Sequence, residues 1–314
     1  MLRKARLIAP LVRSLLLGAA LVPGLVLTGS VLVGCEDEND PMTHVKKLKE
    51  PAEQRQAIKQ LLQMYADAES KDKKDPEKPN VKKILDVIMV PLVETCLDEK
   101  VKDADRSKLV KFMADTRDDR ARPCLKKTLD DYKPDTNEDD VTNVLLNVAA
   151  TKDKELLPSV MKVLKTTERA RPKGQALGPH INKSLRGIVD KSVEDELLKM
   201  LEPEIEPNTP AGLNQLFWQQ TAAWMLGHIQ SEKAIEPLLK ILLTPQKGPV
   251  QGVSLLSLVK IGKPAVPATE KLLKGEDAEL VKYSEEQQLK IAEKDTNGKI
   301  PETDRKSTRL NSSH

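Results

Sequence analysis

One short pattern recurs along this chain at a nearly regular interval. Five segments end in a lysine, an apolar or threonine residue and a leucine, and their lysines are separated by 35, 37, 41 and 31 residues. The segments are RPCLKKTL, LLPSVMKVL, EDELLKML, IEPLLKIL and AVPATEKLL, which contain Lys127, Lys162, Lys199, Lys240 and Lys271. A sixth, VPLVETCL, carries Thr95 at this position. Similarity at such a period is typical of repeat proteins.

Each repeat is expected to hold two helices. A proline precedes five of the six endings by three or four residues, a placement that favours the first turn of a helix; these prolines are Pro91, Pro123, Pro158, Pro237 and Pro267. Amphipathic segments lie ahead of them, such as QRQAIKQLLQMYADA, DRSKLVKFMADT, EDDVTNVLLNVAAT, NQLFWQQTAAWMLGHI and GVSLLSLVKIG. Their apolar residues recur every three or four positions, as in Val141, Val144, Leu145 and Val148.

The expected fold class is therefore all-α. The whole chain contains only seven Phe, Tyr and Trp residues, which disfavours a core built from sheets. Neither helix of a pair can bury its apolar face alone, so consecutive pairs must cover one another. We expect an α-solenoid, a right-handed superhelix of about six helix pairs.

Two segments resemble the HEAT-repeat family in its short bacterial form, known also from PBS-type lyases. LGHIQSEKAIEPLLKILL and LVKIGKPAVPATEKLL match the pattern Leu-Gly-x-Ile-Gly, then Ala-Val/Ile-x-Pro, then Leu. Ser231 and Lys263 stand where the family has a turn aspartate, and the units before residue 200 match only faintly. The resemblance covers about residues 51–275 as a HEAT-like repeat array. It implies a solenoid whose concave face binds protein partners.

The N-terminus resembles a bacterial lipoprotein signal. Residues 1–34 combine Arg3, Lys4, Arg6 and Arg13 with a 21-residue apolar run that lacks acids. Leu32, Val33, Gly34 and Cys35 match the lipobox, which implies cleavage after Gly34 and lipidation of Cys35. The alternative is an uncleaved membrane anchor, since the run is long enough to span a bilayer. Both interpretations place the remainder outside the cytoplasm.

We expect residues 35–50 to be an acidic tether, since the segment EDENDPM directly after Cys35 is too polar to pack. The resemblance implies a lipid-anchored, extracytoplasmic location in the bacterial cell envelope. Glu36 follows the cysteine where inner-membrane lipoproteins often have aspartate, which favours the outer membrane.

At the other end, residues 304–314 (DRKSTRLNSSH) show no apolar periodicity and correspond to a common sequencing-adapter oligonucleotide translated in frame. We treat them as an artefact and expect residues 276–303 to be the start of a further repeat or a linker, truncated there. Leaving out both ends changes the formal charge from +3 to −3. Without a basic stripe, nucleic-acid binding is not expected.

Few residues indicate chemistry. His44, His180 and His228 have no partner at the spacing of a zinc site, and no phosphate loop or nucleophile elbow occurs. The sequence thus predicts no catalytic residue, no cofactor, no metal and no small-molecule substrate. Segment 293–303 partly matches a calcium loop, but Glu293 replaces its first aspartate. We expect a protein-binding scaffold rather than an enzyme; the alternative is an enzyme or enzyme-maturation factor of the HEAT-like lyase type.

Three further features have two interpretations each. KTTERARPKGQ, residues 165–175, is either a solvated loop or a docking site for an acidic partner or anionic lipid. In LFWQQTAAWM, Phe217 and Trp224 are expected in the core and Trp218 at the surface. Alignment of the repeats on their prolines puts Cys96 and Cys124 one turn apart, which predicts two free thiols rather than a disulfide.

Overall fold

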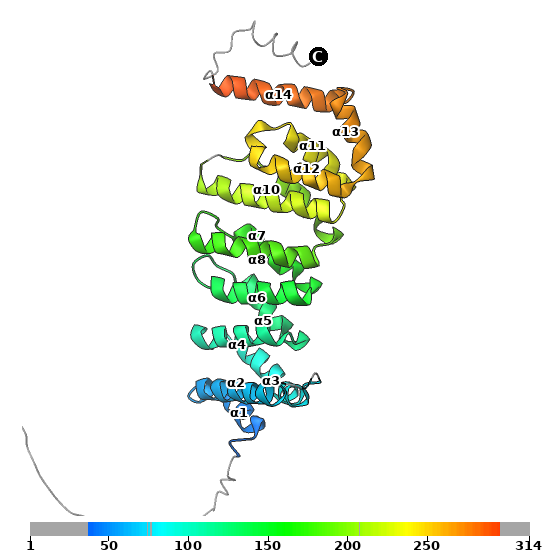
Figure 1. Cartoon of the computed structure of the whole chain (residues 1–314). Helices are drawn as coiled ribbons and strands as arrows, with labels where there is room; N and C mark the ends of the chain where they lie inside the picture. The colour runs from blue at the N-terminus through cyan, green and yellow to red at the C-terminus, as the bar shows by residue number, and fades with distance from the viewer. Residues whose placement is uncertain (1–36, 74, 76, 207, 296–314) are drawn as a thin grey trace, which may run out of the picture. The chain divides into compact units, whose positions relative to one another are not determined.

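The protein is all-helical. The computed structural model describes residues 37–73, 75, 77–206 and 208–295. Apart from Asp37, these residues belong to one compact unit that begins at Glu38. Regular structure within them consists of fourteen α-helices and six single-turn 3-10 helices, without a strand (Figure 1). The predicted all-α class is therefore confirmed.

The α-helices are α1 (Pro41–Lys47), α2 (Gln54–Lys71), α3 (Pro79–Leu97), α4 (Asp103–Thr116), α5 (Arg122–Asp130), α6 (Glu138–Thr151), α7 (Leu157–Thr166), α8 (Pro172–Ile188), α9 (Glu194–Leu201), α10 (Pro210–His228), α11 (Ile235–Leu242), α12 (Gly248–Ile261), α13 (Val266–Leu273) and α14 (Ala278–Asp295). The 3-10 helices are η1 (Asp119–Ala121), η2 (Lys154–Leu156), η3 (Lys191–Val193), η4 (Glu232–Ala234), η5 (Pro245–Lys247) and η6 (Lys263–Ala265).

From α4 onward, a long helix, a 3-10 turn and a short helix follow one another repeatedly. In the pair α6 and α7, the long helix ends next to Lys152, whose left-handed backbone (φ 58°) turns the chain. Asp153 then accepts a hydrogen bond from the backbone N–H of Glu155 at 3.1 Å and so caps η2. Asp118 and Asp190 cap η1 and η3 in the same way. Aspartates therefore begin the turns of three units. All three lie before residue 200, where the resemblance to the HEAT pattern is faint.

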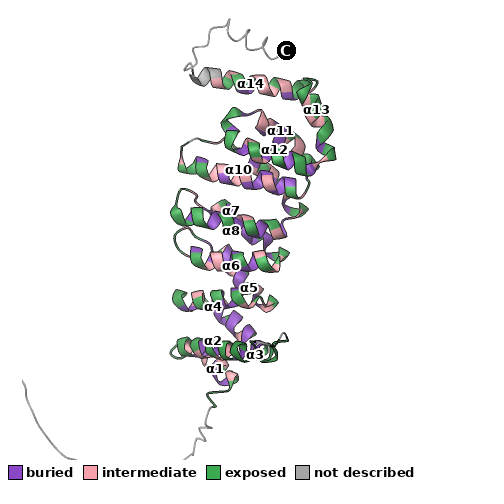
Figure 2. Ribbon diagram, viewed as in Figure 1, coloured by how far each residue is buried: buried purple, intermediate pink, exposed green. Residues whose placement is uncertain are grey.

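Consecutive helix pairs are neighbours in space. Among the long helices, α2 contacts α4, α4 contacts α6, α6 contacts α8, α8 contacts α10, and α10 contacts α12. Among the second helices, α3 contacts α5, α5 contacts α7, and α11 contacts α13. Figure 2 shows buried residues distributed along this whole succession of helices. The core is therefore continuous from one pair to the next.

The helix face predicted for α6 is buried. Val141, Val144, Leu145 and Val148 are each 0% exposed, and α6 lies between α4 and α8. Burying four branched aliphatic side chains contributes about 1.5–3 kcal/mol each. This large gain depends on both neighbouring helices, because an isolated α6 would expose the same face.

Helices α10 and α12 approach each other closely at a glycine. A Cβ atom on Gly227 would lie 2.6 Å from the Cα of Ser257, which is closer than real carbon contacts allow. Any larger residue would have to separate the two helices. The Leu-Gly dipeptide of the repeat pattern therefore has a packing role at this position.

Ion pairs join the turns of successive units. Arg122 Nε, just after η1, lies 2.6 Å from Asp153 Oδ2 in the next turn. Lys154 lies 3.8 Å from Asp190, one turn further along. Each aspartate thus caps its own 3-10 helix and pairs with a base of the preceding unit.

One sequence expectation was wrong and two need correction. The tether expected at residues 35–50 contains α1, which contacts α2 and α3 and buries Thr43 and His44. Pro91 does not begin a second helix; it lies inside α3, which continues from Pro79 to Leu97. Segment 165–175 is not simply a loop, because α7 ends at Thr166 and α8 begins at Pro172. Helix α8 contains Pro179, Gly178 and Gly187 and therefore gave no clear helical signal. Pro123, Pro158, Pro237 and Pro267 do lie in the first turns of their helices.

The C-terminal helices pack less tightly. No residue of α13 is buried. Helix α14 contacts α11, and just beyond the end of α11 the Thr244 hydroxyl lies 2.8 Å from the Tyr283 hydroxyl. The prediction that residues 276–303 start a further repeat or form a linker stays a prediction.

The anchor predictions concern residues outside the described part of the chain. Residues 1–34, Gly34 among them, and Cys35 are not described, so cleavage and lipidation stay predictions. Among the helices that are described, none combines the length and apolar character needed to span a bilayer.

Leu239→Ala should test the buried face of α11. Leu239 is 1% exposed, so removing three carbons should lower the free energy of unfolding by about 2–5 kcal/mol. Leu255→Ala on α12 is the control, because Leu255 is 54% exposed and its removal should leave stability nearly unchanged. Urea denaturation measures both; equal effects would contradict the assigned helix faces.

The ionic contact between α2 and α4 should make stability depend on pH. Burial acts to raise the pKa of Asp105, but hydrogen bonds from Arg55 at 3.0 Å and Lys108 at 3.1 Å outweigh it and lower the pKa. The folded state therefore gains stability above the pKa of the unfolded chain and loses it as the pH falls through the lower, folded value.

Asp105→Asn should consequently lower the free energy of unfolding at neutral pH by about 1–3 kcal/mol and flatten its decline in acid. Asp115→Asn is a matched control on the same helix, since Asp115 pairs with Lys111 in solvent, at 67% exposure. Urea titrations at a series of pH values provide the measurement. An unchanged acid profile in Asp105→Asn would refute this role.

Candidate functional site

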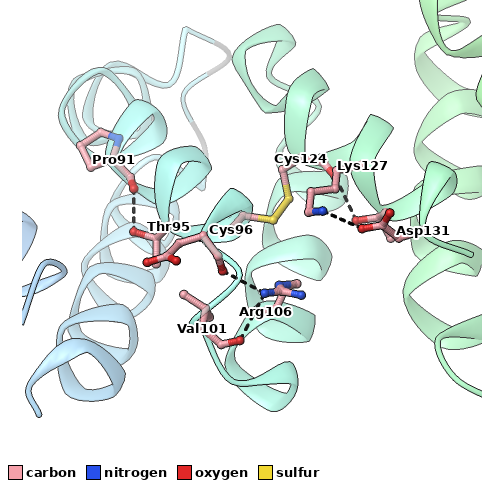
Figure 3. Close-up of a disulfide and its surroundings, with 10 residues drawn as sticks. Pro91, Thr95, Cys96, Val101, Arg106, Cys124, Lys127 and Asp131 are labelled. Carbon is pink, nitrogen blue, oxygen red and sulfur yellow. Dashed lines mark hydrogen bonds and ion pairs between the residues drawn. A yellow bond between two sulfur atoms is a disulfide. The ribbon is translucent and has the colours of Figure 1, made fainter. Parts of the chain in front are cut away.

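A disulfide joins two second helices. Cys96 lies in the last turn of α3 and Cys124 in the first turn of α5, with their Cα atoms 5.9 Å apart (Figure 3). Both cysteines are buried. Helix α4 leads the chain away from α3, and η1 brings it back to α5, so residues 28 positions apart meet.

The prediction of two free thiols was wrong. It took Pro91 as the start of a helix and therefore placed Cys96 and Cys124 one turn out of register. Because α3 runs uninterrupted through Pro91, Cys96 is at its C-terminal end, beside the N-terminal end of α5. Thr95, which donates to the Pro91 carbonyl at 2.8 Å, lies on this continuous last turn.

A pocket of about 620 Å³ lies beside the disulfide. Residues from α3, α4, α5, α6, α8 and their connections line it, with acids and bases intermixed. These residues are Cys96, Glu99, Asp103, Ala104, Arg106, Ser107, Val110, Cys124, Lys127, Thr128, Asp131, Lys133, Thr136, Asn137, Glu138, Asp139, Asp140 and Lys173. Contacts within the wall satisfy several of these charges.

Two basic side chains of the wall are held by the protein itself. Lys127 Nζ lies 2.8 Å from Asp131 Oδ2. Arg106 Nη2 donates to the Asp98 carbonyl at 2.9 Å. It also donates to the Val101 carbonyl at 3.3 Å, as Figure 3 shows. The Nε of Arg106 is buried and has no hydrogen-bond partner among the described residues. Arg106 thus closes the turn after α3.

The acidic side of the pocket is formed by the start of α6. Asp140 accepts a hydrogen bond from Ser107 at 2.5 Å. Burial, reinforced by the negative charges of Asp139 and Asp103, raises the pKa of Asp140. Glu138 is buried, and within the described part of the chain its Oε2 has no hydrogen-bond partner, although Lys173 Nζ is 3.8 Å from it.

The described residues provide no metal centre, since nowhere in them do three His, Cys, Asp or Glu side chains converge. In the partial calcium loop, the backbone is helical as far as Asp295, and everything from residue 296 on lies outside the described part. The three histidines considered as zinc ligands, His44, His180 and His228, are far apart in the sequence. His44 bonds the Glu38 carbonyl at 2.8 Å, and His228 stacks on Trp224.

The aromatic residues of α10 are arranged differently from expectation. Phe217 is buried as predicted, but Trp224 is only half-buried and lines a surface pocket of about 230 Å³. Trp218 is not a free surface residue, because its indole N–H donates to the Leu164 carbonyl of α7 at 2.8 Å. The spacing of apolar residues in α10 did not show that this helix contacts both α8 and α12.

Comparisons with known proteins leave the assignment to the structure itself. No protein-family model matches the chain, and no curated protein matches it.

The disulfide should stabilise the fold. Closing a loop between residues 28 positions apart restricts the unfolded chain, which corresponds to about 3–4 kcal/mol. Cys96→Ala with Cys124→Ala should therefore lower the free energy of unfolding by about this amount in urea. A reductant should weaken the wild type similarly and leave the double variant unaffected. Equal midpoints for wild type and variant would contradict a stabilising disulfide.

Proposed function

We propose that this chain is a lipid-anchored protein of the bacterial cell envelope whose helix pairs form a HEAT-like α-solenoid that binds a protein partner. The carrying observation is the succession of contacts from α2 to α12. Stacked pairs of this kind provide long surfaces for other proteins. In this proposal Cys35 is lipidated after cleavage behind Gly34, and the concave face, lined by the second helices, receives the partner.

The disulfide supports the extracytoplasmic part of the proposal. Disulfides persist in oxidising environments and are rare in the cytosol. The Cys96–Cys124 bond lies in the folded unit, whereas Cys35 lies ahead of it and is left for lipidation. The outer membrane remains the favoured destination because of Glu36.

The alternative function is that of an enzyme or enzyme-maturation factor. The pocket beside the disulfide favours it, because Asp140 has a raised pKa and Glu138 has a buried oxygen without a hydrogen-bond partner. Among the described residues, no group of three His, Cys, Asp or Glu side chains that could hold a metal ion accompanies these acids. We therefore place the scaffold first.

Cys35→Ser should abolish labelling of the full chain by a fatty-acid analogue in bacterial cells and leave unprocessed precursor. Two or more acyl chains are required for stable anchoring, so the variant should also lose lipid-mediated membrane retention. The variant with Cys96→Ala and Cys124→Ala is the control and should be labelled normally. Labelling and cleavage of Cys35→Ser would refute lipidation at this residue.

The partner is tested separately by a photo-crosslinking residue. Lys199 is exposed on the second helix α9, and Lys59 is exposed on the long helix α2. A crosslinker at position 199 in intact cells should give an adduct of one defined mass, whereas position 59 should not. Absence of adducts from position 199, or identical adducts from both, would contradict a partner on the second-helix face.

A further inference from the structure

Charge is distributed unevenly among the long helices. Helices α2, α4 and α6 carry several acids, including two in the first turn of α4 and three in the first turn of α6. Helices α8, α10 and α12 contain no Asp or Glu, while α8 contributes Lys183 and Arg186, and α12 contributes Lys260. These three bases are exposed. The later long helices thus carry only positive charges.

Two adjoining pockets lie along α8 and α10. Each has a volume of about 230 Å³, and both are lined by Phe217 and Gln220. One extends toward Arg169 and Leu213, and the other toward Arg186 and Trp224. Because they share two residues, they form one groove, which we call the α8–α10 groove. No carboxylate lines it.

Cations lie on the aromatic rings of this groove. Arg169 Cζ is 4.6 Å from the Phe217 ring centre, and Arg186 Cζ is 4.6 Å from that of Trp224. A second cation contacts Trp224, since Lys260 Nζ is 4.0 Å from the centre of its ring. Arg169 Nη1 donates to the carbonyls of Gly174 at 2.8 Å and Gln175 at 2.6 Å. The other N–H groups of a guanidinium stacked on a ring lie in its plane and can donate to a carboxylate.

These positive charges are not neutralised within the described residues. Neither Arg169, Lys183, Arg186 nor Lys260 forms an ion pair there. The neighbouring Arg171, in contrast, pairs with Asp135 and Glu168, and Lys165 pairs with Glu196. The basic segment 165–175 is thus largely satisfied internally, and Arg169 is its one base in the groove.

We propose that the α8–α10 groove binds an acidic, extended segment of a partner protein. Phe217 and Trp224 are seven residues apart on α10, which separates the two cationic ends by about 10 Å. A peptide in the polyproline II conformation has three residues per turn and rises about 3.1 Å per residue, so residues i and i+3 lie on the same face about 9 Å apart. The preferred segment therefore adopts this extended conformation, with carboxylates at positions i and i+3 and apolar residues between them. The groove lies on the long helices, so this contact is additional to the one proposed on the second-helix face, and it relies on the proposed scaffold function for the existence of a partner.

The test uses the full chain in detergent and a labelled, end-blocked peptide, Gly-Ser-Glu-Leu-Leu-Glu-Gly-Ser. The control peptide has Gln in place of both Glu residues. Fluorescence anisotropy at low salt should show binding at least about tenfold tighter for the Glu peptide, and this preference should shrink as salt shortens the screening length. No binding up to about 1 mM, or equal binding of both peptides, overturns the proposal.

The residue test compares two charge-matched variants. Arg186→Gln with Lys260→Gln should weaken binding of the Glu peptide at least about tenfold, the effect of losing a charge-assisted contact. Lys59→Gln with Lys83→Gln removes the same charge from exposed positions of α2 and α3 and should not. Circular dichroism should show equal helicity. Equal affinities of both variants overturn the assignment.

A measurement with lipid vesicles distinguishes a peptide-binding groove from a membrane-binding one. Phosphatidylglycerol vesicles should not bind more weakly to the Arg186→Gln, Lys260→Gln variant than to the control variant. If vesicles show that dependence and the peptide does not, the groove is a lipid site and the proposal is wrong. The crosslinking at Lys199 is independent of the groove, so failure here leaves the scaffold proposal to its own test.

Discussion

From α4 to α12, the helix pairs have apolar faces that neighbouring pairs cover. Helix α6 shows the constraint most clearly, because its four core valines and leucines are fully buried between α4 and α8. The same requirement sets the close approach at Gly227 and brings successive turns near enough for Arg122 to pair with Asp153. Stability of a unit therefore depends on the presence of the next one.

This stacking divides the charged side chains into two groups. The turns and second helices use many of their charges for contacts between units, such as Lys165 with Glu196 and Lys233 with Asp195. The long helices α8, α10 and α12 have no acids to pair with, so Arg186 and Lys260 lie on Trp224 instead. Charges left over from folding are the ones that can recognise a partner.

Much of the helix pattern could be predicted from the sequence, because α6, α10 and α12 carry apolar residues at helical spacing. Helix α8 could not, since Pro179 and three glycines obscure it, although contacts with α6 support it. The disulfide was missed for a related reason. A proline signals a helix start only by local preference, and at Pro91 the packing of α3 overrides that preference. The α8–α10 groove depends on residues from three helices, which periodicity does not bring together.

Small-angle scattering on residues 38–295 tests the stacked arrangement most directly. A compact domain of that length has a radius of gyration of about 18 Å. If the pairs stack only on their sequence neighbours, as in the proposed solenoid, the measured radius should be clearly larger, with a skewed distance distribution. A radius of about 18 Å with a symmetric distribution would contradict the solenoid.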